Sequence, residues 1–171
     1  MTTSPATLRS RTGSTSIDPR SPRFGAGITA VLLLVVIALS LAAPSVGTLG
    51  QRATAPGFIL FVAISALFAW GAGAGVQRHP YGAVFRALVR PRLDPPRELE
   101  DAAAPTFAQG VGFVITLAGI ILHLAGVPFA LVIAASAAFI AAFLNSVFAF
   151  CLGCQFYVLI LRVRNARGAA A

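Results

Sequence analysis

The chain has 171 residues, of which 57% are hydrophobic and only 11% are charged. Soluble domains carry roughly 25% charged residues, so this chain cannot cover a water-facing surface, and a soluble globular domain is excluded. The net charge of +8 would fit nucleic acid in a soluble protein, but all thirteen basic residues are arginines at the ends of apolar segments. That distribution is typical of membrane orientation, so we predict one all-α domain, a polytopic membrane helix bundle with about four crossings and no nucleic-acid partner.

The first predicted crossing spans residues 24–43, after a tail rich in Ser, Thr, Pro and Arg over residues 1–23. The tail has no apolar periodicity and is predicted to be disordered, at least as far as Ser16. The apolar run has about the 20 residues that a helix needs to cross the hydrocarbon core, and it exceeds the usual length of a signal peptide. We therefore favour a retained anchor over a cleaved leader. Cleavage would also leave Pro44 directly after the cleavage site, where proline is unfavourable.

The second predicted crossing spans residues 56–76, with Pro56 in the first helical turn, where proline is tolerated. Gly71 and Gly75 have the spacing that lets two helices approach closely in lipid. An equally weighted alternative is that Gly73 and Gly75 mark the end of the helix.

Residues 77–105 form the only substantial polar loop, with five arginines and an acidic cluster. Between Pro80 and Leu93 the apolar residues fall on one helical face and the arginines elsewhere, which predicts a short helix in the membrane interface among lipid phosphates. A docking surface for a cytoplasmic partner is the less favoured alternative.

The third predicted crossing spans residues 107–125, and residues 128–161 then form 34 uncharged positions. A helix of that length would measure roughly 50 Å, too long for a hydrocarbon core of about 30 Å. Either two short crossings or one crossing with a kinked or interfacial extension is possible, and we favour one crossing, followed by a cytoplasmic tail at 162–171.

Four crossings with a cytoplasmic N-terminus place twelve arginines inside and Arg52 alone outside. The positive-inside rule therefore predicts that both termini are cytoplasmic. Arginine without lysine, together with abundant alanine, is typical of GC-rich bacterial genomes, so we predict a multi-pass protein of the bacterial cell membrane.

The only conventional chemical motif is the CxxC sequence formed by Cys151 and Cys154. Helical residues three apart lie on one face, so the two sulfur atoms can meet, and Gly153 would ease a bend or the approach of another backbone. A redox dithiol is weighed against a structural pair and, with less weight, a metal site. The depth of the pair in the bilayer decides whether its thiols can be reached. If the last crossing ends just before Arg162, Cys154 and Cys151 lie roughly 12 and 16 Å inside that end. If it begins at Pro128 instead, they lie near the cytoplasmic face.

The other polar residues carry weaker signals. His123, in the outer half of the third crossing, is more simply a neutral histidine bonded to a helix carbonyl, and His79 suits the inner interface. Asn145 is predicted to hydrogen-bond another helix. All five acidic residues lie in inner segments, which argues against a proton-driven pump. No cofactor and no metal site are predicted.

Four stretches, Ile17–Arg20, His79–Gly82, Arg90–Leu93 and Phe148–Tyr157, resemble an uncharacterised bacterial membrane family, the domain of unknown function forty-three ninety-five. The resemblance covers the chain from Ile17 to Arg162, and the cysteine-bearing stretch is its most specific part. The family has no established activity. What the resemblance implies is an association with thioredoxin-like and sulfur-transfer proteins.

Three functional hypotheses follow. The first is a thiol–disulfide or sulfur-handling partner in which Cys151 and Cys154 alternate between dithiol and disulfide, with either cysteine as the attacking group. The second is a scaffold or assembly subunit, an oligomer included, because Ala134, Ala138 and Ala142 form a small-residue face. The third is a carrier for a small solute. The sequence does not decide whether the chain is an enzyme.

Overall fold

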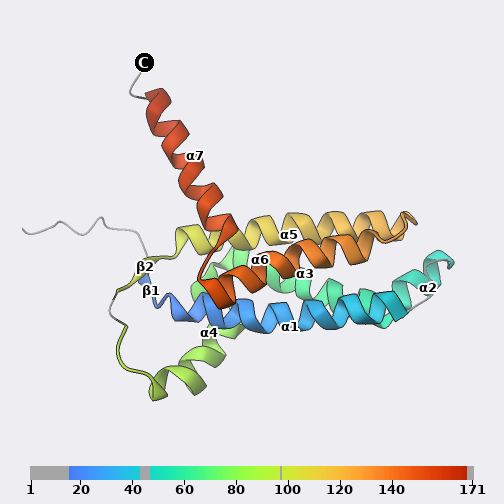
Figure 1. The fold of residues 1–171 in the computed structure, drawn as a ribbon, viewed down its shortest axis with the longest axis horizontal. Helices are drawn as coiled ribbons and strands as arrows, with labels where there is room; N and C mark the ends of the chain where they lie inside the picture. Colours follow the sequence, from blue (N-terminus) through green and yellow to red (C-terminus); the bar gives the residue numbers. More distant parts are fainter. Residues whose placement is uncertain (1–15, 43–46, 97, 169–171) are drawn as a thin grey trace, which may run out of the picture.

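The computed structural model describes residues 16–42, 47–96 and 98–168, and its four longest helices run side by side in an antiparallel bundle (Figure 1). Each of the four is long and apolar enough to cross a membrane. They are α1 (Arg20–Ala42), α3 (Pro56–Ala74), α5 (Ala103–Leu124) and α6 (Ala130–Phe148). The predicted membrane bundle with four crossings is confirmed.

Shorter elements occupy the two ends of the bundle. α2 (Leu49–Thr54) lies at one end, where Thr48 and Gln51 form a capping box. The opposite end holds the strand pair β1 (Ser16–Ile17) and β2 (Glu100–Asp101), and a helical run that leaves the bundle sideways. That run comprises η1 (Val76–Arg78), α4 (Pro80–Val84), η2 (Phe85–Val89) and η3 (Arg90–Arg92).

The short helix predicted between Pro80 and Leu93 is therefore present. Phe85 is its buried anchor and its ring lies 5.7 Å from that of Phe24, measured between centroids. Val84 and Leu88 are exposed on the same run, so most of the predicted apolar face points away from the bundle.

The prediction of a disordered tail is wrong for residues 16–23. Ser16 and Ile17 pair with Asp101 and Glu100, and α1 already begins at Arg20, four residues before the apolar run. The reason is local: the Asp18 carboxylate accepts hydrogen bonds from the backbone and guanidinium of Arg20 and so caps the first turn of α1. Residues 1–15 lie outside the described part of the chain. At the other terminus, the segment predicted as a tail continues as helix through Gly168.

The centre of the bundle is an apolar core in which large side chains of α1 and α3 pack against alanines of α6. Leu33 and Val36 of α1 and Phe61 of α3 have no exposed surface, and they meet Ala135 of α6. Gly119 of α5 lies so close to Ala134 of α6 that a Cβ at that position would overlap it. Small residues thus let the helices approach closely, as they do in other membrane bundles.

The small-residue face of α6 is used inside the chain. Ala134, Ala138 and Ala142 are all buried, and the contact between α6 and α1 is the most extensive between any two helices in the described segments. This face therefore already has a partner within the chain, and the formation of an oligomer stays a prediction. Gly71 likewise lies against Gln109 of α5, whereas Gly75, with a φ of 83°, ends α3. Both predictions for the glycines of this helix are thus correct in part.

The arginines divide between the two ends of the bundle. Arg52 lies in α2, at what we call the Arg52 end. The other end, which we call the arginine-rich end, holds Arg20 and Arg23 at the start of α1 and, in the described part of the α3–α5 connection, Arg78, Arg86, Arg90 and Arg92. α7 (Leu152–Gly168) also starts there, runs crosswise to the bundle and carries three more arginines (Figure 1).

Candidate functional site

The long uncharged segment does not form one helix, because α6 ends at Phe148. Ala149 adopts a left-handed conformation with a φ of 56°, and the N–H of Phe150 donates to the carbonyl of Leu144 over 3.1 Å. This is the αL termination that more often uses glycine. A new helix, α7, starts at Leu152, so Cys151 occupies the position directly before a helix N-terminus.

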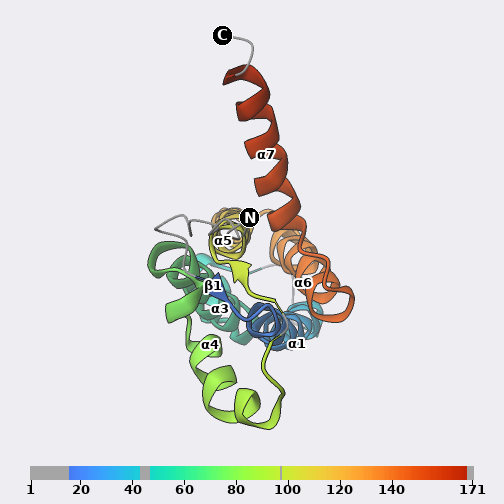
Figure 2. The same cartoon turned by 90° about the vertical axis from the view of Figure 1, so that its left-hand side faces the viewer.

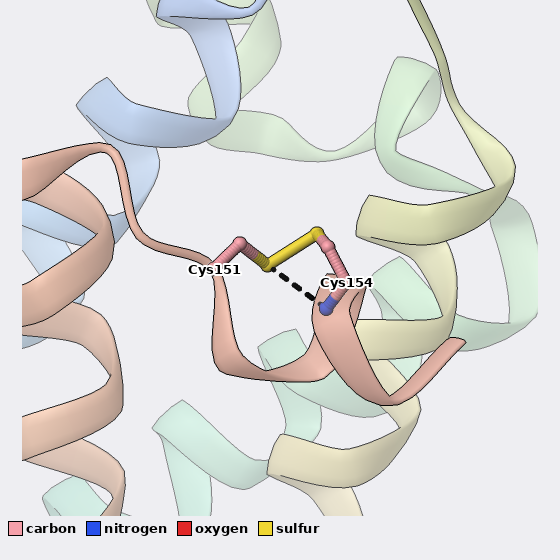
Figure 3. The surroundings of a disulfide bond; sticks show 2 residues. All are labelled: Cys151 and Cys154. Carbon is pink, nitrogen blue, oxygen red and sulfur yellow. Dashed lines mark hydrogen bonds between the residues drawn. A yellow bond between two sulfur atoms is a disulfide. The ribbon is translucent and has the colours of Figure 1, made fainter. Parts of the chain in front are cut away.

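Cys151 and Cys154 form a disulfide at this N-terminus (Figure 3). Their Cα atoms are 5.2 Å apart, and the N–H of Cys154 points at the Cys151 sulfur over 3.3 Å. The Cys151 sulfur thus takes the place of a capping oxygen, which receives an N–H from the third helical residue. Negative charge on that sulfur would be stabilised by the free N–H groups and the dipole of α7. Both cysteines are half-buried.

The first turns of α7 are fixed against the start of α5. Gly153 is buried, and a Cβ placed there would lie 2.5 Å from the Cβ of Ala108 and 2.6 Å from its Cα. One turn later, the rings of Tyr157 and Phe107 lie 5.6 Å apart. The predicted close approach of another backbone at Gly153 is confirmed, and it locks the cysteine pair to the bundle. Beyond this contact, every residue from Val158 to Arg167 is exposed.

A cavity of about 650 Å³ opens beside the cysteine pair. It enters the bundle from the arginine-rich end and is bounded by α1, α3, α5, α6 and the start of α7. Both cysteines are part of its wall, as are the amide side chains of Gln109 and Asn145. Arg23, Arg86 and Arg90 also belong to the lining. The sequence near the cysteines contains no cation within seven positions, but the fold brings arginines of distant segments to the same cavity.

His79 forms part of the cavity wall as a neutral, fixed side chain. Its Nδ1 accepts the N–H of Tyr81 over 3.3 Å, so Nε2 carries the proton and donates to the Leu67 carbonyl over 3.2 Å. Burial lowers the pKa of His79, and the hydrogen bond to Leu67 opposes that shift only in part. His79 therefore acts as the N-cap of α4 and joins the arginine-bearing run to α3.

Tyr81 ties the same run to α1. Its ring packs against Gly25, where an added Cβ would lie 3.4 Å away. Burial raises the pKa of Tyr81, and a hydrogen bond with Thr29 opposes the rise. The phenol is consequently neutral at physiological pH and serves as a polar anchor in the wall of the cavity.

An ion pair stands at the mouth of the cavity. The Arg20 guanidinium contacts both oxygens of Asp18 at 3.0 Å and also donates to the Asp94 carbonyl over 2.9 Å. Burial raises the pKa of Asp18, but the hydrogen bonds and charge of Arg20 outweigh burial and lower it overall. Asp18 is thus a carboxylate at neutral pH, and it holds the Arg20 side chain that connects α1 to the loop before β2.

Asn145 differs from its prediction. It makes no hydrogen bond to another helix within the described segments; it faces the cavity instead, because α6 ends one turn later and leaves open space beside it. His123 agrees with its prediction in part: it makes a hydrogen bond with the backbone of Arg52 in α2, and its ring stacks on Phe58 at 5.2 Å. Among the residues placed by the structure none partners its buried Nε2. His123 lies near the Arg52 end, so the fold does not bring it to the cysteines.

The sequence of this chain matches the model of a family described as Domain of unknown function (DUF4395), over residues 17–162. The chain belongs to this family. No curated protein and no solved structure matches the chain. The DUF4395 match includes every residue of the cavity wall, from Ile17 and Asp18 to the cysteine pair.

Sequence reasoning missed three features of the site: the helix break at Ala149, the cavity, and Gln109 and Asn145 as its polar lining. The only sequence signal for the break was the excess length of the uncharged segment. Nothing in the local sequence indicates a break at Ala149, since neither proline nor glycine occurs between Phe148 and Cys151.

Proposed function

We propose that this DUF4395 protein exchanges thiols and disulfides with a soluble, thioredoxin-like protein through Cys151 and Cys154. The observation that carries the proposal is the position of the CxxC pair at the free N-terminus of α7, half-buried and next to a cavity. A purely structural disulfide would be expected in a closed, apolar setting between helices, where thiols are inert. Here the pair is reached from the arginine-rich end.

The two sulfur atoms have different tasks in this exchange, which the capping position of Cys151 supports. A thiolate of the partner attacks the Cys151 sulfur, the bond to Cys154 breaks, and Cys154 leaves as a thiol after taking up a proton. The partner's second thiolate then attacks the mixed disulfide, which frees Cys151 and completes the partner's own disulfide. Two electrons pass from the partner to this chain, and the reverse sequence returns them. Cys151 is the attacking residue in that reverse direction, because its charge is stabilised by the N-terminus of α7.

We further propose that the arginine-rich end faces the cytoplasm of a bacterial cell. Nine arginines of the described ranges belong to segments that start or end here, against Arg52 at the other end. Short connecting segments with such an excess of arginine stay on the cytoplasmic side. This orientation presents the cysteine pair to cytosolic proteins, in agreement with a soluble thiol partner.

Trapping of the mixed disulfide tests the proposal. Cys154→Ser removes the resolving thiol of this chain, and the partner's own resolving thiol is removed by using a thioredoxin whose second cysteine is replaced by serine. With the first cysteine of that thioredoxin carried as a mixed disulfide with thionitrobenzoate, Cys151 should displace thionitrobenzoate, and the covalent complex should accumulate. Cys151→Ser is the matched control and should yield at most a tenth as much complex, because Cys154 lacks the capping position. If neither variant forms a reducible complex, or if Cys154 alone does so, the proposal or its assignment of roles is wrong.

A second function, as a subunit of a larger membrane assembly, is supported by the outer part of α7. Val158, Leu159 and Ile160 are 40%, 55% and 45% exposed, and no other described segment covers them. Native mass spectrometry after gentle extraction would test this function. A stable complex that is lost on Leu159→Glu supports it, whereas a lone chain in every preparation contradicts it.

A further inference from the structure

The cavity beside the cysteines continues far into the bundle. Its wall includes Ile64 in the middle of α3 and Ala138 in the middle of α6, each ten residues from the end of its helix. At a rise of 1.5 Å per residue, these positions lie roughly 15 Å below the arginine-rich end. Since a hydrocarbon core is about 30 Å thick, the cavity reaches the middle of the bilayer. A soluble partner protein has no need of such a depth.

The wall has the chemistry of a site for a neutral ring with polar oxygens. Most of its wall is apolar, and the wall includes the aromatic rings of Phe68 in α3 and Phe85 nearer the mouth. Gln109 and Asn145 add amide N–H groups, and neither makes a hydrogen bond to another residue in the described ranges. Apolar pockets of 300–1,000 Å³ with a few convergent polar groups are typical of small-molecule sites. The arginines lie only at the mouth, so a charged ligand would find no counter-ion deeper in the cavity.

A second hollow on the outside of the bundle shares part of its wall with this cavity. A groove of about 960 Å³ runs between α3 and α5, and its lining includes the small residues Ala72, Gly73 and Gly110. Three residues, Gln77, Val111 and Ile115, belong to the walls of both hollows. The groove and the cavity are thus separated by a wall to which these three side chains belong, and their movement would admit a molecule dissolved in the bilayer.

We infer that the cavity binds the ring of a membrane quinone, and that this quinone reoxidises the Cys151–Cys154 dithiol. This inference rests on the proposed thiol exchange and names its second substrate. The two thiols lose two protons and two electrons as the sulfur–sulfur bond forms, and the quinone takes up both to become a hydroquinone. Electrons then flow from the soluble dithiol through the cysteine pair to the quinone. The ring packs among the aromatic residues, and its carbonyl oxygens accept hydrogen bonds from Gln109 and Asn145.

The test uses the full chain, reduced and placed in lipid nanodiscs free of quinone, under anaerobic conditions. The probe is a fully substituted benzoquinone with a short alkyl tail, because an unsubstituted ring position would alkylate the thiols. Quinone loss is followed by absorbance, and disulfide formation is followed by thiol alkylation and intact mass. We expect saturable kinetics and one quinone consumed for each disulfide formed.

Three variants locate the site. Ala141→Phe fills the cavity from a half-buried position of its wall and should raise the quinone KM at least tenfold. Ala66→Phe, the same change at an exposed position outside the cavity wall, is the matched control and should leave KM unchanged. Asn145→Leu keeps the shape but removes the amide, and loss of one hydrogen bond of about 1 kcal/mol should raise KM about fivefold.

The outcomes separate this inference from the proposed function. If the wild-type dithiol reacts with quinone without saturation, or if Ala141→Phe and Asn145→Leu react like the wild type, the quinone site is refuted. Exchange with a thioredoxin-like protein, measured on the same nanodiscs, would then still stand by itself. If quinone oxidises the pair at the cavity but no soluble dithiol reduces it, the quinone site holds and the proposed partner is wrong.

Discussion

The helices end in different ways at the two ends of the bundle. At the Arg52 end, α5 ends at Leu124, Gly126 follows with a φ of 86°, and Val127 donates to the Leu122 carbonyl over 3.0 Å. The Arg52 guanidinium adds a hydrogen bond to the carbonyl of Leu124 over 3.2 Å. The last four carbonyls of α5, from Ile121 to Leu124, thus each have a donor, so these polar groups are used for structure.

At the arginine-rich end the helices separate instead. α6 ends at Ala149, without the glycine that such a termination favours, and α7 and the α4 run leave the bundle in different directions (Figure 2). The space between them becomes the cavity, and the free N–H groups of α7 meet a sulfur rather than an oxygen. The cavity and the cysteine pair of this chain therefore lie at the end where the helices separate, and not at the end where their termini are fully hydrogen-bonded.

The largest effect is expected from Gly153→Ala. The new Cβ would meet the backbone of Ala108, which cannot move aside as a flexible side chain would. We expect a loss of about 1 to 3 kcal/mol in the free energy of unfolding and at least a tenfold fall in the rate of thiol exchange, because the start of α7 is displaced. Gly73→Ala is the control, since a Cβ there meets nothing within 4 Å. Equal behaviour of the two variants would contradict this account of α7.

Gly126→Ala makes the corresponding change at the Arg52 end. A Cβ at Gly126 would lie 2.5 Å from Arg52 Nη1, and the positive φ is unfavourable for alanine by about 1 to 2 kcal/mol. Thermal unfolding should therefore occur a few degrees lower, while the rate of thiol exchange at a temperature well below the transition stays that of the wild type. A variant that loses exchange but not stability would show that the two ends are not independent.

Asp18→Asn should lower stability by about 1 kcal/mol at neutral pH, because Arg20 loses its charged partner at the mouth of the cavity. The folded-state pKa of Asp18 is lowered from the ordinary value of 3.8, so its contribution is fully present above that value. It is lost as the pH falls through the lower folded-state pKa. Melting temperatures of both proteins should converge over that acidic range, and a difference that persists there would exclude the charge as its cause.

Ala149→Gly should have the smallest effect, and a favourable one. Glycine adopts the left-handed conformation without the steric cost that alanine has, so we expect a gain of roughly 0.5 to 1 kcal/mol in the free energy of unfolding. Ala149→Val is the opposite control and should destabilise the chain. If valine were tolerated as well as glycine, the break between α6 and α7 would not depend on this conformation.

The sequence predicted what hydropathy and charge determine. Four apolar segments of sufficient length, with arginines between them, leave few alternatives to a membrane bundle, and the structure confirms it. The helical run near Pro80 was also predictable, because its apolar positions recur at helical spacing. These features depend on local composition alone.

The site depends on tertiary contacts, which is why the sequence did not reveal it. Phe148, Ala149 and Phe150 are compatible with a continuous helix, and the break is set by the packing of Gly153 on Ala108, 45 positions away. Gln109 and Asn145 come from different helices and meet only around the cavity. Asp18 was assigned to a disordered tail, because capping by one carboxylate has no periodic signature.

The central claim, that Cys151 and Cys154 form a working redox pair, has one direct test. The oxidised chain in nanodiscs is mixed with a reduced thioredoxin, quenched in acid and alkylated, and its intact mass is measured. We predict two alkyl groups on each chain, a matching loss of thiols from the thioredoxin, and full reversal when oxidised thioredoxin is supplied in excess. A chain that gains no alkyl group under native conditions, but gains two after it is unfolded in reductant, would contradict the account.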